Sequence, residues 1–375
     1  MEWKEVRLGD ILNFRRGHDL PHSAMKPGNI PVAGSNGVIG YHDTATPIKP
    51  ILTIGRSGNV GKPYFYEEAW AHNTTLYVDD FKGNDPKFLY YLCQTMPFAN
   101  FGGGSAVPTL NRNHIHPLET KIPVKVEDQR RIASILSSLD RKIELNNKIN
   151  ADLEEMAQAI FKNWFVDFEP FKDGKFVDSE LGMIPEGWKV GCLGDITSNK
   201  SAKVKERTDV KVLSPVTTGE LVLSEEYFSK QVFSSSIAKY KIVNIGDFAY
   251  NPARVNIGSL GRNEFEFDGC VSPVYVVFSV IDGYENYFDL FRKTDFFKDK
   301  VASLAIGGVR QSLSYDDLSS IETIIPNINI VEKFNNLYNQ MKKTIKANKQ
   351  ESSRLSLLRD TLLPRLMSGE LEVPE

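Results

Sequence analysis

The sequence predicts an α+β protein in which two similar mixed α/β domains alternate with two long helices that pair as an antiparallel coiled coil. Three observations predict this pseudo-two-fold internal repeat. Residues 2–11 return as residues 187–196, residues 117–123 return as residues 320–326, and a long segment with helical spacing follows each of the later blocks. Such a chain presents two related surfaces at a fixed separation, which suits an extended ligand.

Composition places the chain among soluble globular proteins with two or three domains. It has 375 residues, of which 41% are hydrophobic and 25% are charged. The net charge of -3 counts against a nucleic-acid binder unless partner proteins supply part of the positive field. Cys93, Cys192 and Cys270 form neither a disulfide framework nor a metal pattern. Without a signal peptide or an apolar run of about 18 residues, we expect a cytoplasmic protein with no membrane contact.

The first globular domain is expected over residues 1–123. Glycine-containing turns separate short β-type runs at 51–54 and 74–78, and residues 87–92 have the pattern of a short helix. These features predict a mixed α+β unit.

The second globular domain is expected over residues 186–326, after a linker at 168–185. Proline and glycine punctuate this linker, but it also carries aromatic residues. We therefore expect it to pack against the rest of the protein.

Two long helices are expected, one over residues 124–167 and the other, with a C-terminal tail, over 327–375. Each would be a rod of roughly 40 Å at 1.5 Å per residue. We expect Pro364 to end the second helix, since proline lacks the backbone N–H that continues a helix.

Apolar residues recur in heptads along both segments, and a lone helix of this kind would expose its seam to water. Asn146 and Asn348 fall at equivalent heptad positions, where a buried Asn fixes register at a cost in stability. The pattern also allows two unrelated amphipathic helices, each packed on its own domain. The expected seam residues are Leu139, Ile143, Asn146, Leu153, Ile160, Met341, Ile345, Asn348, Leu355 and Leu362.

Several patterns that resemble catalytic or cofactor motifs fail in detail. The run 55–62 lacks the spacing and the Ser/Thr of a phosphate-binding loop. Residues 250–254 lack the second proline and the stacking aromatic of an amino-methyltransferase. His114 and His116 have no further zinc ligand nearby, and Glu119 lacks an upstream acidic partner for a metal nuclease. We therefore expect no catalytic residue, no metal site and no cofactor on this chain.

The turns that contain Arg56 and Arg254 are candidates for nucleic-acid contacts. A glycine-hinged turn with Arg and Asn can bring backbone amides and a guanidinium to a phosphate or a base edge. Lysines after residue 199 could track a phosphate backbone. Ordinary hairpin turns and a solvated lysine face remain alternatives. The candidate DNA-binding residues are Arg56, Ser57, Asn59, Lys62, Asn111, Arg112, Lys200, Lys203, Asn251, Arg254, Asn256, Arg310 and Gln311.

With these residues in view, the whole chain resembles a specificity subunit of a type I restriction–modification system. The resemblance is carried by residues 127–140, 163–171, 182–188 and 362–371, and by the order domain, helix, domain, helix. It implies a non-catalytic DNA-reading subunit with two target recognition domains, 1–123 and 186–326. Each would face one half of a bipartite, asymmetric site, with the paired helices setting the distance between the halves.

The same resemblance implies partners that carry the chemistry. Two methylation subunits would bring S-adenosylmethionine and adenine-N6 methylation, and restriction subunits would bring an ATP-dependent motor, with ATP and Mg on those partners. Two other functions remain open at this stage. One is a coiled-coil adaptor without DNA contact, and the other is a self-sufficient DNA methyltransferase or nuclease.

Overall fold

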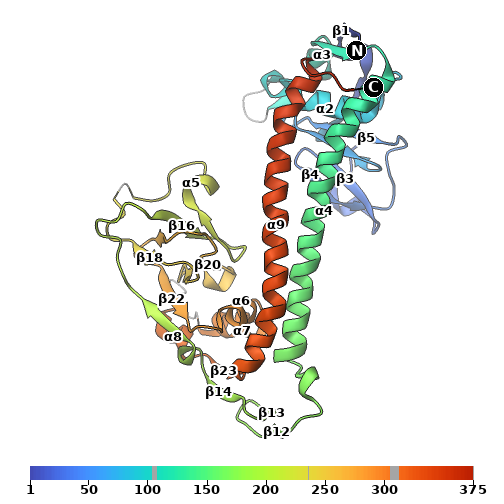
Figure 1. Cartoon of the computed structure of the whole chain (residues 1–375). Coiled ribbons are helices and arrows are strands. Elements are labelled where there is room, and N and C mark those ends of the chain that lie inside the picture. The colour runs from blue at the N-terminus through green and yellow to red at the C-terminus, as the bar shows by residue number, and fades with distance from the viewer. Residues whose placement is uncertain (104–107, 235, 305–311, 375) are drawn as a thin grey trace. The chain divides into compact units, whose positions relative to one another are not determined.

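The computed structural model describes residues 1–103, 108–234, 236–304 and 312–374. They form two compact units, one comprising Met1–Ile149 with Ala347–Glu375 and the other Asn150–Lys346. Both units combine helices with strands, so the expected α+β class is confirmed (Figure 1).

The first unit is built mainly on antiparallel strands. Its strands are β1 (Trp3–Arg7), β2 (Asn13–Arg16), β3 (Ile30–Gly34), β4 (Gly37–His42), β5 (Ile51–Gly55), β6 (Pro63–Tyr66), β7 (Trp70–Ala71), β8 (Thr75–Asp80), β9 (Gly102–Gly103), β10 (Thr109–Leu110) and β11 (Glu119–Pro123). Its short helices are α1 (Leu8–Ile11), α2 (Pro86–Thr95) and α3 (Arg112–Ile115), with 3-10 turns η1 (His22–Ala24) and η2 (Phe98–Phe101). The main sheet has the order β2-β8-β5-β6, and β4-β3-β7 forms a second sheet.

The expected strands at 51–54 and 74–78 and the expected helix at 87–92 are confirmed as β5, β8 and α2. Helix α2 begins after Asp85, whose carboxylate accepts a 2.8 Å hydrogen bond from the Phe88 amide and so satisfies an otherwise unpaired N–H. The buried face of α2 lies in one apolar core with residues of β2, β5, β8 and the start of α4 (Val126–Phe165).

The second unit has the same kinds of element. Its strands are β12 (Phe176–Val177), β13 (Ile184–Pro185), β14 (Lys189–Cys192), β15 (Thr197–Lys200), β16 (Lys211–Pro215), β17 (Leu221–Leu223), β18 (Lys241–Val243), β19 (Phe248–Tyr250), β20 (Leu260–Arg262), β21 (Gly269–Val271), β22 (Val276–Val280) and β23 (Glu322–Ile325). Its short helices are α5 (Ser224–Tyr227), α6 (Glu285–Phe291), α7 (Asp295–Leu304) and α8 (Tyr315–Ser319), with 3-10 turns η3 (Glu169–Phe171), η4 (Leu193–Asp195) and η5 (Val255–Ile257). The main sheets are β15-β22-β19-β20 and β17-β16-β21-β18.

Several arrangements occur once in each unit. Strand β1 pairs with β11, and β14 pairs with β23, in both cases antiparallel. The Leu8 amide donates to the Leu118 carbonyl at 2.8 Å, and the Leu193 amide donates to the Ile321 carbonyl at 2.9 Å. Each unit therefore ties an early strand, β1 or β14, to the strand that leads into a long helix.

The long helices, α4 and α9 (Ile328–Met367), have 40 residues each and contribute a segment to both units. In the first unit their segments lie side by side, with Arg359 Nη1 donating to Asp140 Oδ1 at 2.7 Å (Figure 1). In the second unit, Phe334 of α9 packs against Phe161 and Phe165 of α4. No helix among the described residues combines the length and hydropathy required to cross a membrane.

All ten expected seam positions are removed from solvent to some degree. The buried ones are Asn146, Met341 and Ile345. The partly buried ones are Leu139, Ile143, Leu153, Ile160, Asn348, Leu355 and Leu362.

The expectation that Pro364 ends the second helix is wrong. Helix α9 continues through Pro364 to Met367, and the Ser368 amide donates to the Pro364 carbonyl at 3.0 Å. Proline removes one hydrogen bond here, while Leu366 and Met367 gain burial in the core of the first unit. The helix ends at Met367 instead. Two residues later, Gly369 has a positive φ of 77°, which favours a residue without a side chain.

The linker packs as expected from its aromatic residues. Phe168 and Phe171 lie 5.3 Å from the ring of Trp188, measured between centroids. These rings join the core of the second unit, together with Phe165 at the end of α4.

Candidate nucleic-acid interface

In the first unit, the candidate turns leave one edge of the sheet β2-β8-β5-β6. Arg16 at the end of β2 pairs with Leu76 at the start of β8, and Gly55 at the end of β5 pairs with Thr75. Because neighbouring strands are antiparallel, the turns after β2 and β5 and the turn before β8 meet at this edge. We call it the first edge.

The turn that carries Arg56, Ser57, Asn59 and Lys62 is fixed by its own backbone. The Gly55 amide donates to the Lys62 carbonyl at 3.0 Å, and the Gly61 amide donates to the Gly55 carbonyl at 2.7 Å. Asn59 and Lys62 are exposed, and Arg56 and Ser57 are partly buried. The turn therefore presents polar side chains from a rigid frame.

Asn111 and Arg112 lie at the same edge. The Leu110 amide donates to the Arg56 carbonyl at 2.8 Å, which brings the start of α3 to the turn. The Asn111 carboxamide accepts from the Asn113 amide at 3.0 Å and caps α3. Arg112 is exposed, yet its Nη1 donates to the Phe14 carbonyl at 3.2 Å, so part of its hydrogen-bonding capacity holds β2.

His116, the residue after α3, supports this arrangement. Its Nε2 accepts a 3.1 Å hydrogen bond from the Phe14 amide, which requires a neutral imidazole. Burial lowers the pKa of His116, and the charge of Arg112 lowers it further. The ring is therefore neutral at physiological pH.

Sequence reasoning missed four polar residues at the first edge: Arg16, Asp19, His72 and Asn73. Arg16 Nη2 donates to Asp19 Oδ1 at 2.9 Å, and Asn73 Nδ2 donates to the same oxygen. Arg56 Nη1 donates to the Asn73 carbonyl at 3.4 Å, linking the two turns. Residues 16–19 and 72–73 are both polar runs beside β-type segments, but no sequence pattern indicates that the fold brings them together.

The second unit has an equivalent edge on the sheet β15-β22-β19-β20, which we call the second edge. Lys200 at the end of β15 pairs with Val277, and Tyr250 at the end of β19 pairs with both Val276 and Leu260. The turn between β19 and β20 therefore leaves this edge. It carries Asn251, Arg254 and Asn256.

This turn is also fixed by hydrogen bonds. Asn251 Oδ1 accepts from the Ala253 amide at 3.1 Å, and the Ser259 amide donates to the Arg254 carbonyl at 3.1 Å. Arg254 and Asn256 are exposed. The Leu313 amide donates to the Pro252 carbonyl at 3.1 Å. The equivalent bond in the first unit is the one from the Leu110 amide to the Arg56 carbonyl.

Lysines also lie near the second edge. Lys203 forms a β-bridge with Lys241, and Lys241 Nζ donates to the Tyr275 carbonyl at 2.6 Å. Burial lowers the pKa of Lys241. Burial also raises the pKa of Tyr275, and the nearby charge of Arg254 partly opposes this second shift. Lys200, Lys203 and Arg254 thus lie around one edge and give it positive charge.

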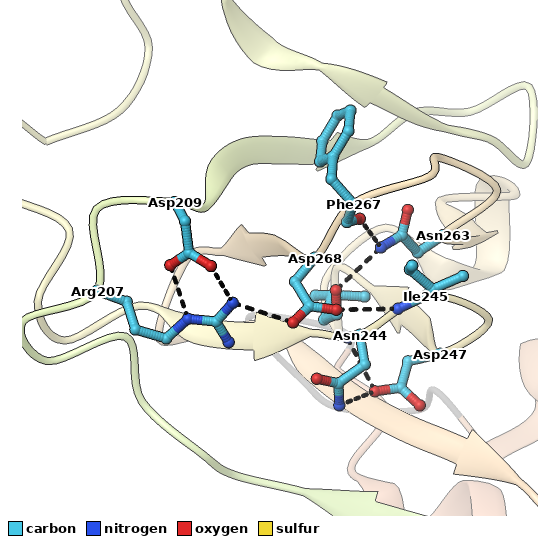
Figure 2. A network of polar contacts seen from close by, with 9 residues as sticks. Arg207, Asp209, Asn244, Ile245, Asp247, Asn263, Phe267 and Asp268 are labelled. Atoms are coloured by element: carbon cyan, nitrogen blue, oxygen red, sulfur yellow. Dashed lines mark hydrogen bonds and ion pairs between the residues drawn. The ribbon is translucent and has the colours of Figure 1, made fainter.

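Arg207 belongs to a different, internal network (Figure 2). Its guanidinium makes two hydrogen bonds to Asp209, at 2.9 and 2.6 Å, and one to Asp268 at 3.0 Å. Asp268 also accepts from the Ile245 amide at 3.3 Å. The charge of Arg207 therefore holds loops together and is balanced within the unit.

Arg310 and Gln311 lie outside the described residues. Within the described ranges, no three His, Cys, Asp or Glu side chains are grouped so as to hold a metal ion. The structure thus brings Arg56, Ser57, Asn59, Lys62, Asn111 and Arg112 to the first edge, and Lys200, Lys203, Asn251, Arg254 and Asn256 to the second.

Known proteins provide an independent comparison. Residues 1–155 match the family described as the type I restriction modification DNA specificity domain. The chain is 30% identical over 311 residues to the type I restriction enzyme MjaIX specificity subunit of Methanocaldococcus jannaschii, covering 77% of this chain and 70% of that one. It is 26% identical over 459 residues to the type I restriction enzyme HindI specificity subunit of Haemophilus influenzae, covering 98% and 94%.

A solved structure has the same fold. The type I restriction–modification system S subunit from M. genitalium superposes with a TM-score of 0.65 at 14% sequence identity. The superposition covers 98% of this chain and 96% of that one.

Proposed function

Because this chain belongs to the family of type I restriction–modification specificity subunits, we propose that it reads a bipartite, asymmetric DNA site with one half in each unit. The target recognition domains are residues 1–123 and 186–326. The observation that carries the proposal is the pair of equivalent sheet edges, each with Arg, Asn and Lys side chains on hydrogen-bonded turns. Arginine and asparagine pair with guanine and adenine in the major groove, and lysine binds phosphate.

The two edges carry different residues, which supports an asymmetric site. At the first edge, Arg56 lies beside Asn73 and Asp19, whereas Arg254 at the second edge lies near Tyr275, whose carbonyl accepts from Lys241. Different side chains on the same scaffold read different bases.

We also propose that α4 and α9 pair as an antiparallel coiled coil that sets the spacing between the half-sites. The contacts within each unit support this direction. Asp140 meets Arg359 and Asn146 meets Glu351, so residue numbers rise along one helix as they fall along the other. Internal duplication of a domain and a helix accounts for the recurring arrangements in the two units.

The chemistry is proposed to reside on partners, since the chain is taken to be non-catalytic. Two methylation subunits would carry S-adenosylmethionine, and restriction subunits would carry ATP and Mg. Apolar surface on the long helices supports two docking faces, because Met156 and Leu358, 202 positions apart, are 49% and 47% exposed. In the second unit, an apolar pocket of about 700 Å³ lies between α4, α6 and α7, lined by Phe161, Phe165, Val166, Tyr287, Phe291 and Phe296.

Single substitutions at the two edges test this function. In the complete complex with its methylation subunits, Arg56→Ala should weaken recognition of one half-site and Arg254→Ala that of the other. Loss of one good base contact is worth about 1–3 kcal/mol, or roughly 5- to 150-fold in binding. Lys4→Ala and Lys189→Ala, exposed residues on β1 and β14, are matched controls that should change neither half. An equal loss of DNA affinity in all four variants would contradict the proposal.

A coiled-coil adaptor and a self-sufficient DNA methyltransferase or nuclease are the two alternative functions. The relatives compared above are named as specificity subunits, which supports neither an adaptor without DNA contact nor a self-sufficient enzyme. Incubation of the purified chain with a labelled methyl donor and DNA tests the non-catalytic assignment directly, and the expected result is no methyl transfer.

A further inference from the structure

Asp19 is an exposed carboxylate at the first edge, where the other polar side chains named above are cationic or neutral. Its side chain is 67% exposed and lies at the first edge, three residues after the end of β2. A hydrogen bond from Asn73 and the nearby charge of Arg16 keep the pKa of Asp19 below its usual value. The group is therefore ionised at physiological pH.

A carboxylate in this position opposes the binding of DNA phosphates, because like charges repel and DNA affinity depends on cationic contacts. Its presence at the edge is favourable for binding only if the bound DNA offers it a hydrogen-bond donor. An ionised carboxylate is an acceptor only. In DNA, the donors that carry sequence information in the major groove are the exocyclic amino groups of cytosine and adenine.

The geometry leaves one oxygen of Asp19 available for such a donor. Arg16 Nη2 and Asn73 Nδ2 both donate to Oδ1. Among the described residues, Oδ2 has no hydrogen-bond partner. One donor is the last residue of β2 and the other lies in the turn before β8, so together they hold the carboxylate in one orientation with Oδ2 open.

We propose that Asp19 is a base-reading residue, whose Oδ2 accepts a hydrogen bond from the exocyclic amino group of a cytosine or an adenine in the half-site bound by the first unit. The inference rests on the proposed function of the two edges and assigns one chemical preference within it. Arg16 and Asn73 are positioning residues for this carboxylate.

The second unit does not share this feature. The third residue after β15 is Lys203, a cation, where the third residue after β2 is Asp19. A lysine donates hydrogen bonds and accepts none. The preference for an amino group is therefore specific to one half-site.

The test uses the full chain in complex with its own methylation subunits, after the methylated site has been identified by sequencing. Duplexes carry a base analogue at one position of the first half-site. Purine replaces adenine and 2-pyrimidinone replaces cytosine, so each analogue lacks only the exocyclic amino group. The two analogues distinguish which base supplies the donor.

With the wild-type chain, one analogue at one position should reduce affinity roughly tenfold or more, as expected for a hydrogen bond to a charged group. With Asp19→Ala, the same analogue should bind as well as the natural base. Asp19→Asn keeps the shape but removes the charge, so it should show an intermediate loss. Unchanged melting temperatures confirm that both variants are folded.

Asp80→Ala is the matched control, since it removes one exposed carboxylate from the opposite end of β8. It should show the same sensitivity to the analogue as the wild type. The inference is overturned if wild type and Asp19→Ala respond alike at every position. That result differs from failure of the proposed function, in which even the wild-type complex would show no base preference in the first half-site.

Discussion

Single side chains at the two edges divide into those that hold the turns and those that face outward. Asn111 and Asn251 accept hydrogen bonds from nearby backbone amides, so they shape the turns they belong to. Asn59, Lys62 and Arg254 are exposed. Substitutions in the first group should change stability as well as recognition, whereas those in the second should change recognition alone.

A buried asparagine between the long helices yields a prediction about stability. Asn146 is fully buried; its Nδ2 donates to Glu351 at 2.8 Å, but its Oδ1 has no partner among the described residues. Removing a buried, unsatisfied acceptor is favourable, so Asn146→Leu should stabilise the protein by about 1 kcal/mol. Urea unfolding measures this directly. Asn146→Ala, which leaves a cavity, should give no such gain.

The histidines yield a prediction about pH. Burial lowers the pKa of His116 from its usual 6.5, so the unfolded chain binds this proton more readily than the folded one. The stabilising effect of neutral His116 is complete above pH 6.5 and is lost as the pH falls below that value. The melting temperature of the wild type should therefore drop between pH 7.5 and 5.

His116→Gln should reduce this drop, because the Gln carbonyl can still accept from the Phe14 amide and does not titrate. His114→Gln, an exposed neighbour on α3, is the control and should leave the pH dependence as it is. An identical acid sensitivity in wild type and His116→Gln would contradict this account.

For single residues, the sequence predicts local clusters of polar side chains but not contacts between residues that are far apart along the chain. The turns with Arg56 and Arg254 are recognisable in the sequence because Gly, Asn and Arg cluster locally in both. Asp19 and Asn73 were missed, since 54 residues separate them and only the pairing of β2 with β8 brings them together. Sequence periodicity carries no information about such contacts.

Among the elements, the long helices were predictable because their apolar residues keep a heptad period over many turns. Helix ends were less predictable. Pro364 suggested a stop, but the burial of Leu366 and Met367 in a tertiary core extends α9 beyond it. The short strands β16 to β18 lack a strong alternating pattern. Strands β16 and β18 both pair with β21, which is distant from them in sequence.

The aromatic contact between the helices in the second unit yields a prediction about packing. Phe334 of α9 is 1% exposed and packs against Phe161, Trp164 and Phe165 of α4. Phe334→Ala should cost about 3–5 kcal/mol of unfolding free energy. Phe296→Ala, at a ring that is already 42% exposed, should cost clearly less in the same urea titration. Comparable losses of unfolding free energy in the two variants would show that the aromatic contacts of Phe334 do not hold the two helices together.

The proposed ruler yields a prediction about spacing. Inserting seven residues into both α4 and α9 adds about 10.5 Å at 1.5 Å per residue and keeps the heptad register. This length corresponds to roughly three base pairs at 3.4 Å each. Sequencing of methylated DNA should show the same two half-sites with a longer spacer. Insertion of four residues breaks the register and should abolish methylation; an unchanged spacer in the seven-residue variant would refute the ruler.

For the whole molecule, charge distribution is more informative than net charge. The chain is slightly acidic overall at -3, yet Arg and Lys side chains gather at the two edges. Cations that contact phosphates make binding fall steeply with salt, even for a protein without overall basic character. The net charge therefore counts against DNA binding, whereas the cationic side chains at the two edges favour it.

The central claim is that two separate units read two halves of one site. The most direct measurement is sequencing of methylated DNA from cells in which residues 1–123 have been replaced by the corresponding domain of another specificity subunit. The account predicts a new first half-site, with the second half-site and the spacer unchanged. A change in both halves, or in neither, would contradict it.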